Sequence, residues 1–205
     1  YLFIESTYGD REHKDFQSSY EELKFAIKDT FQRGGNVIIP SFALERTQEL
    51  LYLFREMYEK KELPPCRVFL DSPLAIKATN LFIQYYDYFD EEAQKIYESG
   101  KNPFYFPYLI FTSSVEDSKN INNIKERAII IAGSGMCNGG RILHHLKHNL
   151  WNEKNSIIFT GFQAKGTLGR KIIDGERYVN IYGEQIQVKA KVYTINGFSS
   201  HADRK

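Results

Sequence analysis

The sequence contains few of the residues on which several functional classes depend. Its only cysteines, Cys66 and Cys137, lie far apart and outside any C-x-x-C pair, which argues against a disulfide framework and against a cysteine-held zinc site. We therefore expect a reduced, cytoplasmic protein. Neither sign of charge is in excess, because 27 Lys and Arg face 26 Asp and Glu. This balance excludes a strongly basic arm that coats nucleic acid by charge alone.

Long hydrophobic runs are also missing. No apolar run approaches the roughly 18 residues that a membrane span needs, and no signal peptide is visible, so we expect no membrane association. The first residue is Tyr rather than Met, and the opening residues, YLFIE, are typical of a strand already in progress. We therefore interpret the chain as a fragment of a longer protein.

The residues that are present predict an α/β fold. Short runs rich in branched residues are typical of strands buried on both faces, and they occur at Val37–Ile39, Val68–Leu70, Leu109–Phe111, Ala128–Ile131 and Ile157–Phe159. Helical patterns over 16–31, 44–58 and 81–86 separate the first strands. This alternation predicts a doubly wound, mostly parallel sheet with helices on both faces. Two further runs, 178–182 and 186–192, predict a C-terminal antiparallel β-hairpin that leads out of the domain.

The first stretch with the composition of a functional site is ESTYGDREH, residues 5–13. Glu5 follows an apolar run and is therefore expected at the carboxyl end of a strand, where open α/β sheets form their crevices. The alternative is a loop that only caps a helix, with Asp10 or Asp15 as the capping residue.

Two more stretches share this composition. In AGSGMCNGGR, residues 132–141, a glycine-rich turn between a strand and a helix can present backbone N–H groups to a phosphate, with Arg141 nearby, although a tight turn explains the glycines equally well. In GFSSHAD, residues 197–203, His201 is a candidate proton donor or metal ligand. Ser199 or Ser200 could hold a phosphate oxygen there. The alternative is an ordinary polar loop.

Two other patterns are weaker. His144 and His148 have the i, i+4 spacing of a zinc-binding helix, but they lack the intervening glutamate and a third ligand, so we interpret them as part of a mildly basic helix face. Asp71 lies at another strand end, and the Ser72-Pro73 pair that follows suits a helix start. We expect Asp71 to be mainly structural.

Taken in order, these stretches resemble the β-CASP branch of the metallo-β-lactamase superfamily, whose members are zinc-dependent nucleases that act on RNA. The resemblance covers essentially the whole chain and rests on Glu5-Ser-Thr-Tyr-Gly, Ser134-Gly-Met-Cys-Asn-Gly-Gly-Arg and Gly197-Phe-Ser-Ser-His-Ala-Asp, supported by GGNVIIPSFALERTQELL (34–51) and GFQAKGTLGRKI (161–172). It is closer to the bacterial and archaeal exonuclease-like members than to the DNA-directed ones.

The resemblance implies specific roles at both ends of the chain. Glu5 matches the acidic residue that orients a histidine, and His201 matches that histidine. His201 would help to stabilise the phosphorane and would protonate the leaving oxygen. Ser199 would lie beside the same phosphate. The family binds two zinc ions through an H-x-H-x-D-H motif and further ligands, and this sequence contains no such motif. We therefore expect zinc in the parent protein, no metal ligands in this fragment, and no RNA cleavage by the fragment alone.

The resemblance also predicts the organisation and partners of the chain. Residues 1–12 would be a strand and loop at the edge of the metallo-β-lactamase domain, and residues 13–177 would form the β-CASP domain. Residues 178–205 would be a hairpin and loop that return to the metallo-β-lactamase domain. RNA and the metallo-β-lactamase domain of the parent chain are the expected partners. The sequence does not decide whether the protein forms a homodimer. Weak, salt-sensitive RNA binding would involve Ser134, Gly135, Arg46, Arg141 and Lys165. The competing hypothesis is a non-catalytic module that binds a nucleotide or phosphate at 133–141.

Overall fold

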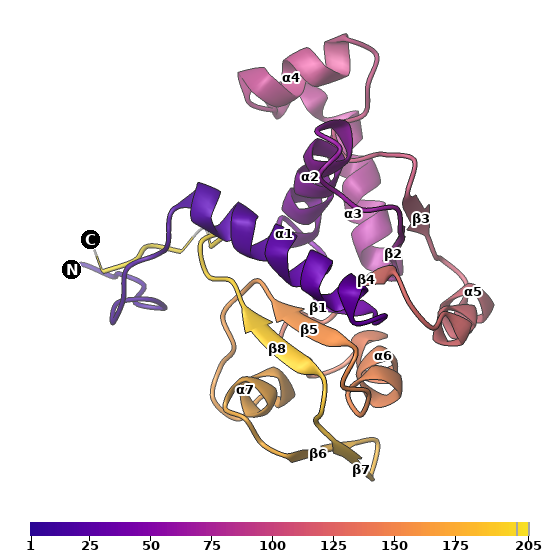
Figure 1. Ribbon diagram of the computed structural model, residues 1–205. Helices are drawn as coiled ribbons and strands as arrows, with labels where there is room; N and C mark the ends of the chain where they lie inside the picture. Colours follow the sequence, from indigo (N-terminus) through magenta and orange to yellow (C-terminus); the bar gives the residue numbers. More distant parts are fainter. Residues whose placement is uncertain (200, 205) are drawn as a thin grey trace.

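A computed structural model describes residues 1–199 and 201–204. Its centre is a six-stranded sheet in the order β3-β2-β4-β1-β5-β8 (Figure 1), and every neighbouring pair is parallel. The strands are β1 Val37–Pro40, β2 Arg67–Leu70, β3 Leu109–Phe111, β4 Ala128–Ala132, β5 Ser156–Phe159 and β8 Lys191–Thr194. A separate antiparallel hairpin joins β6 Tyr178–Ile181 to β7 Glu184–Gln187. The predicted α/β class, parallel sheet and C-terminal hairpin are confirmed.

Helices cover both faces of the sheet. They are α1 Phe16–Gln32, α2 Arg46–Glu59, α3 Pro73–Gln84, α4 Glu91–Glu98, α5 Val115–Asn120, α6 Ile142–Asn149 and α7 Leu168–Ile173, with short 3-10 turns at Tyr86–Tyr88 (η1) and Ile121–Asn123 (η2). One core cluster joins α1, α2 and α3 to one face of the sheet, and a second joins α6, α7 and the hairpin to the other face. Strands β1, β4 and β5 are buried along their whole length, which explains their continuous apolar sequences.

Two helix starts follow the predicted chemistry. The Asp15 side chain accepts the N–H of Ser18 at 2.8 Å and caps α1, so Asp15 rather than Asp10 is the capping residue of the first loop. Ser72 caps α3 through the N–H of Ala75, and Pro73 occupies the first helical position, where its missing N–H costs nothing. Both caps fix where the chain leaves the loops and enters its helices.

The prediction of a strand over residues 1–5 is wrong, because the structure has no strand there. Residues 1–6 form neither strand nor helix, and Tyr1, Leu2, Phe3 and Ile4 are at least 80% exposed. A strand needs a neighbour for its N–H and C=O groups, and no described strand pairs with this segment. Glu5 therefore follows an extended apolar segment rather than a paired strand.

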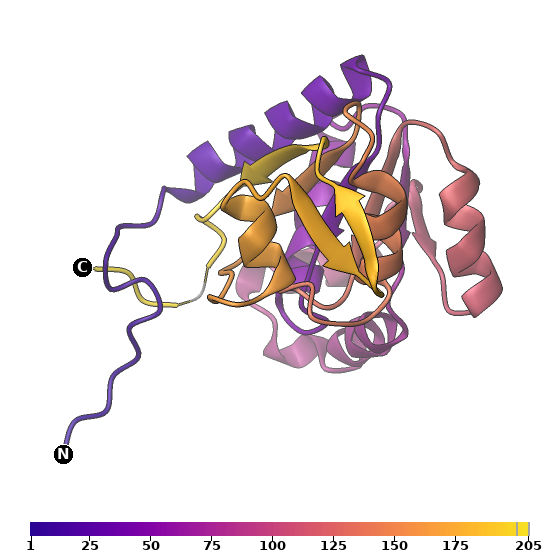
Figure 2. The same ribbon diagram turned by 90° about the horizontal axis from the view of Figure 1, so that it is seen from below.

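The single strand expected over 186–192 is also wrong, because the structure divides it into two. Strand β7 ends at Gln187, and the N–H groups of Lys189 and Ala190 both donate to the carbonyl of Leu150, at 2.8 and 2.9 Å. These bonds turn the chain toward the main sheet, where β8 pairs with β5. Residues 195–199 and 201–204 then leave the domain on the same side as the N-terminal segment (Figures 1 and 2).

No helix within residues 1–199 and 201–204 is both long enough and apolar enough to cross a membrane.

Candidate active site

Glu5 and His201 lie together where the two ends of the chain meet. Glu5 Oε2 is 3.4 Å from His201 Nδ1. The same carboxylate accepts the N–H of Thr7 through Oε2 at 2.9 Å and the N–H of Ala202 through Oε1 at 2.7 Å. The pair is open to solvent, with the His201 side chain 56% exposed. The imidazole can therefore reach a ligand while its Nδ1 faces a carboxylate.

The surroundings of Glu5 keep it ionised. Hydrogen bonds from the Thr7 hydroxyl and N–H, aided by the Ala202 N–H and the His201 charge, lower the pKa of Glu5 from 4.5 to about 2. A carboxylate held this way presents a fixed negative charge to Nδ1 of the imidazole. The arrangement is suited to a histidine that donates a proton.

Tyr8 anchors the loop that carries Glu5. Most of residues 1–12 are exposed, but Tyr8 is only 2% exposed. Its ring centroid lies 4.6 Å from that of His13, 5.6 Å from that of Phe162 and 6.3 Å from that of His201. Tyr8 therefore holds the N-terminal loop against the domain next to His201.

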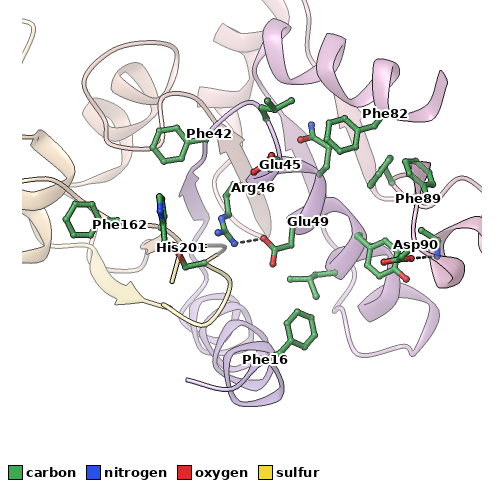
Figure 3. A pocket seen from close by; sticks show the side chains of 18 of the residues that line it. Phe16, Phe42, Glu45, Arg46, Glu49, Phe82, Phe89, Asp90, Phe162 and His201 are labelled. Carbon is green, nitrogen blue, oxygen red and sulfur yellow. Dashed lines mark hydrogen bonds and ion pairs between the residues drawn. The ribbon is translucent and has the colours of Figure 1, made fainter. Parts of the chain in front are cut away.

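A cavity of about 940 Å³ adjoins the pair. His201 and Phe162 lie at one side and Phe82, Phe89 and Asp90 at the opposite side (Figure 3). Seven aromatic side chains line it, namely Phe16, Phe42, Tyr52, Phe82, Phe89, Phe104 and Phe162. Thr7, Ser199 and His201 contribute polar groups, and Glu45, Arg46, Glu49 and Asp90 contribute charged ones. An aromatic wall beside an imidazole and a serine fits a ligand that has flat apolar rings and an anionic group.

Arg46 and Glu49 form an ion pair inside this cavity (Figure 3). Burial raises the pKa of Glu49, and the Arg46 charge opposes that rise. The helix expected from Leu44 begins at Arg46, because Glu45 adopts a φ of +63° and the chain enters α2 through a tight turn. That turn places the Arg46 side chain on the wall of the cavity.

The glycine-rich loop, residues 132–141, lines the cavity only through Met136 and otherwise supports the residues that line it. The Ser134 hydroxyl accepts the N–H of Asn138 at 3.0 Å. Gly135 lies under the ring of Phe42, and a Cβ at this position would come within 2.7 Å of that ring. Because only glycine leaves room for this contact, Gly135 determines where the Phe42 ring lies on the cavity wall.

Arg141 is engaged inside the domain. Its guanidinium donates to Asp71 Oδ1 at 2.7 Å and to the carbonyls of Thr112 and Ser113 at 3.0 and 2.9 Å. Asp71 is completely buried and its Oδ2 lies 2.6 Å from His145 Nε2. This cluster joins the ends of β2 and β3 to α6, and Arg141 is not among the residues that line the cavity.

The other residues singled out in the sequence lie in different surroundings. Ser199 lines the cavity, and its hydroxyl accepts the N–H of His201 at 3.2 Å. Ser200 lies outside the described residues. Lys165 is exposed in the loop between β5 and α7. The ring of His144 packs against Tyr182, and no group of three or more His, Cys, Asp or Glu side chains in the described part of the chain could hold a metal ion.

Sequence reasoning missed the aromatic wall, Glu49 and His13. The rings come from α1, α2 and α3 and from the loops that follow β1, η1, α4 and β5, and each has the spacing of an ordinary core residue. The 15% aromatic content is the one general signal, and it does not separate wall from core, because Phe104, Tyr52, Phe82 and Phe89 also belong to or pack against the first core cluster.

Comparison with known proteins identifies the family of this chain. The Beta-Casp domain family model matches residues 47–172. The chain is 41% identical over 201 residues to Ribonuclease TTHA0252 of Thermus thermophilus, and 38% and 37% identical to the transcription termination factors FttA of Methanocaldococcus jannaschii and Thermococcus kodakarensis. These alignments cover 98–100% of this chain but only 46%, 33% and 32% of the respective relatives. The chain therefore spans less than half the length of each of these relatives.

Proposed function

Because this chain belongs to the Beta-Casp domain family of the metallo-β-lactamase superfamily, we propose that it forms one wall of the RNA cleft of a ribonuclease. The observation that carries the proposal is the Glu5–His201 pair, 3.4 Å apart, whose histidine lines a cavity rich in aromatic side chains. The relative from Thermus thermophilus is named a ribonuclease, which supports RNA as the substrate.

In this proposal His201 supplies the proton for the leaving oxygen of the scissile phosphodiester. Glu5 faces Nδ1, so the proton to be transferred lies on Nε2, the nitrogen that Glu5 leaves free. The carboxylate partner at Nδ1 orients the ring so that Nε2 points away from Glu5. Ser199 lines the same end of the cavity, and its hydroxyl is a candidate donor to a non-bridging phosphate oxygen.

The cavity wall would hold the RNA strand. Nucleobases stack on aromatic side chains with little sequence preference, and seven Phe and Tyr side chains line this cavity. Arg46 places a cation on the same wall, but it is paired with Glu49, and Glu45 and Asp90 add two further carboxylates to the lining. The nearly neutral chain, with a net charge of +1, offers few phosphate contacts, so binding to this wall alone would be weak and sensitive to salt.

Zinc does not fit the described residues, because they include no cluster that could hold a metal ion. We therefore assign the two zinc ions of the expected enzyme to residues outside this chain, in a metallo-β-lactamase domain that would form the opposite wall of the cleft. The roles proposed for Glu5, His201 and Ser199 require only that the phosphate reaches the mouth of the cavity.

The competing module, with a nucleotide or phosphate at residues 133–141, is less well supported. Its arginine, Arg141, is already bonded to Asp71 and to two backbone carbonyls, so the loop has no free guanidinium to offer an anion.

The test is RNA cleavage by the complete natural protein that contains this chain. We expect cleavage that His201→Ala abolishes or nearly abolishes and that His148→Ala, on helix α6, leaves unchanged. Protection of the protein against thermal unfolding by a mononucleotide, but not by RNA, would instead support the competing module.

A further inference from the structure

The peptide group that follows His201 is held at both of its polar ends. Its N–H, which belongs to Ala202, donates to Glu5 Oε1 at 2.7 Å. Its carbonyl, which belongs to His201, lies 3.0 Å from His13 Nε2. A carbonyl oxygen only accepts hydrogen bonds, so His13 must carry its proton on Nε2. Glu5 and His13 thus clamp one peptide plane from opposite sides.

His13 is itself anchored to the same C-terminal segment. Its backbone N–H donates to Asp203 Oδ2 at 2.9 Å. A second bond joins the same two segments, because the N–H of Arg204 donates to the carbonyl of Arg11 at 2.9 Å. The His13 ring packs edge-on against Tyr8, with the centroids 4.6 Å apart. Residues 11–13 and 201–204 therefore run side by side outside the main sheet (Figure 2).

No regular element holds the described residues of this segment. His201 follows β8 by several residues, and residues 201–204 have neither strand nor helix structure. The side chain of His201 is more than half exposed and so has little packing to fix it. The clamp on the adjacent peptide therefore acts beside the Glu5 contact at Nδ1 and the bond of the His201 N–H to Ser199 in fixing the direction in which the side chain leaves the backbone.

We propose that His13 is a positioning residue for His201, an inference that rests on the proposed ribonuclease function. By fixing the peptide between His201 and Ala202, His13 sets the ψ angle of His201 and keeps Nδ1 in reach of Glu5. It need not touch RNA. A misplacement of a reacting group by about 1 Å can lower a rate by roughly 10²-fold, so loss of this single hydrogen bond affects turnover more than binding.

Two variants of the complete natural protein separate the hydrogen bond from simple packing. His13→Phe keeps a ring against Tyr8 but removes the donor, and His13→Gln keeps an N–H donor at a similar distance from the backbone. We expect His13→Phe to lower kcat by about 10- to 100-fold with KM changed by less than about threefold. We expect His13→Gln to retain most of the wild-type kcat.

Amide hydrogen exchange provides a readout that does not depend on activity. In His13→Phe the N–H of Ala202 should exchange faster than in the wild type, whereas the amides of β4 (128–132), in the centre of the sheet, should be unchanged. His13→Gln should restore protection at Ala202. A general loss of stability would instead speed exchange in β4 as well.

The outcomes are distinct. Wild-type kcat and unchanged Ala202 exchange in His13→Phe would overturn the clamp, and so would equal losses in His13→Phe and His13→Gln. A rise in KM alone would show that His13 binds substrate rather than positioning His201. If the wild-type protein cleaves no RNA, the proposed function fails, while faster exchange at Ala202 in His13→Phe would still establish that His13 holds the loop.

Discussion

The carboxylate of Glu5 and the imidazole of His201 come from opposite ends of the chain, yet Glu5 Oε2 lies 3.4 Å from His201 Nδ1. Glu5 also accepts the N–H of Ala202, so one side chain contacts both the ring and the backbone of the C-terminal loop. Two segments with no regular structure of their own are thereby joined into one site at the edge of an α/β domain.

Glu5→Gln should lower RNA cleavage by the complete protein by about tenfold or more, because the ring loses a charged partner during proton transfer. The amide oxygen of Gln can still accept from Ala202, so the loop itself should stay in place. Asp10→Asn is the matched control, since Asp10 is an exposed carboxylate of the same loop that pairs with Arg11 instead. Equal rates for Glu5→Gln and the wild type would contradict the assigned role.

The same contacts predict a pH dependence. The pKa of Glu5 is lowered from 4.5 to about 2, so the contacts it makes are fully present above pH 4.5 and are lost as the pH falls toward 2. No titration of Glu5 should therefore appear in the activity profile between about pH 5 and 8. Titration of the Glu5 carboxyl carbon by NMR would check this, and a midpoint near 4.5 would show that the carboxylate is not held as described.

Asp71 should be a major determinant of stability. Burial by itself would raise its pKa, but hydrogen bonds from His145, Ser118 and Arg141 hold it at about 2. Asp71→Ala leaves these partners without their acceptor, and removing one member of a buried charge pair typically costs about 3–5 kcal/mol of unfolding free energy. Urea unfolding would measure this loss.

Asp174→Ala is the control for Asp71→Ala. Asp174 pairs with Arg170 four residues earlier on an exposed face, a contact worth only about 0.3–0.5 kcal/mol. The stabilisation from Asp71 should be complete above its usual pKa of 3.8 and should disappear as the pH falls toward 2. Similar effects of the two variants would mean that the Asp71 cluster does not brace the fold.

The ion pair between Arg46 and Glu49 predicts opposite effects on RNA binding. Glu49→Gln removes the charge that neutralises Arg46, so RNA should bind more tightly, whereas Arg46→Gln should weaken binding. Each phosphate of a single strand that a variant newly engages or releases should change the slope of log K against log[salt] by about 0.7. Salt titrations of RNA binding would test this, and changes in the same direction for both variants would contradict it.

Gly135→Ala should displace the ring of Phe42, because the new Cβ would come within 2.7 Å of it. If that ring stacks on a base, RNA affinity should fall by up to about 1–3 kcal/mol. Gly139→Ala in the same loop is the control, since no other atom lies within 4 Å of a Cβ there. Unchanged RNA affinity in Gly135→Ala would remove Phe42 from the binding wall.

The centre of the fold was predictable from sequence because its signals are local. Aliphatic runs such as Val37–Ile39 are buried on both faces in the structure, and the caps at Asp15 and Ser72 lie where their residue types predict. Segment 186–192 was not predictable as two elements, because its alternating pattern suits a strand, and only the tertiary bonds to the Leu150 carbonyl divide it.

The site was predictable in part for the same reason. Motif residues such as Glu5 and His201 are recognisable by type and order, but nothing local indicates that Arg141 would be bonded to Asp71. The aromatic wall draws residues from several helices and loops, and side chains such as Phe82 and Phe89 follow the pattern of core residues. The role of His13 depends on a contact with the far end of the chain, which no spacing can reveal.

Proton donation by His201 is the central claim, and one comparison tests it directly. Single-turnover cleavage by the complete wild-type protein and by His201→Ala should be measured on RNA and on the same RNA with sulfur in place of the leaving bridging oxygen. A thiolate leaves without a proton, so we predict that His201→Ala loses about 10²- to 10⁴-fold on the oxygen substrate and far less on the sulfur substrate. An equal loss on both substrates would contradict a proton-donating role for His201.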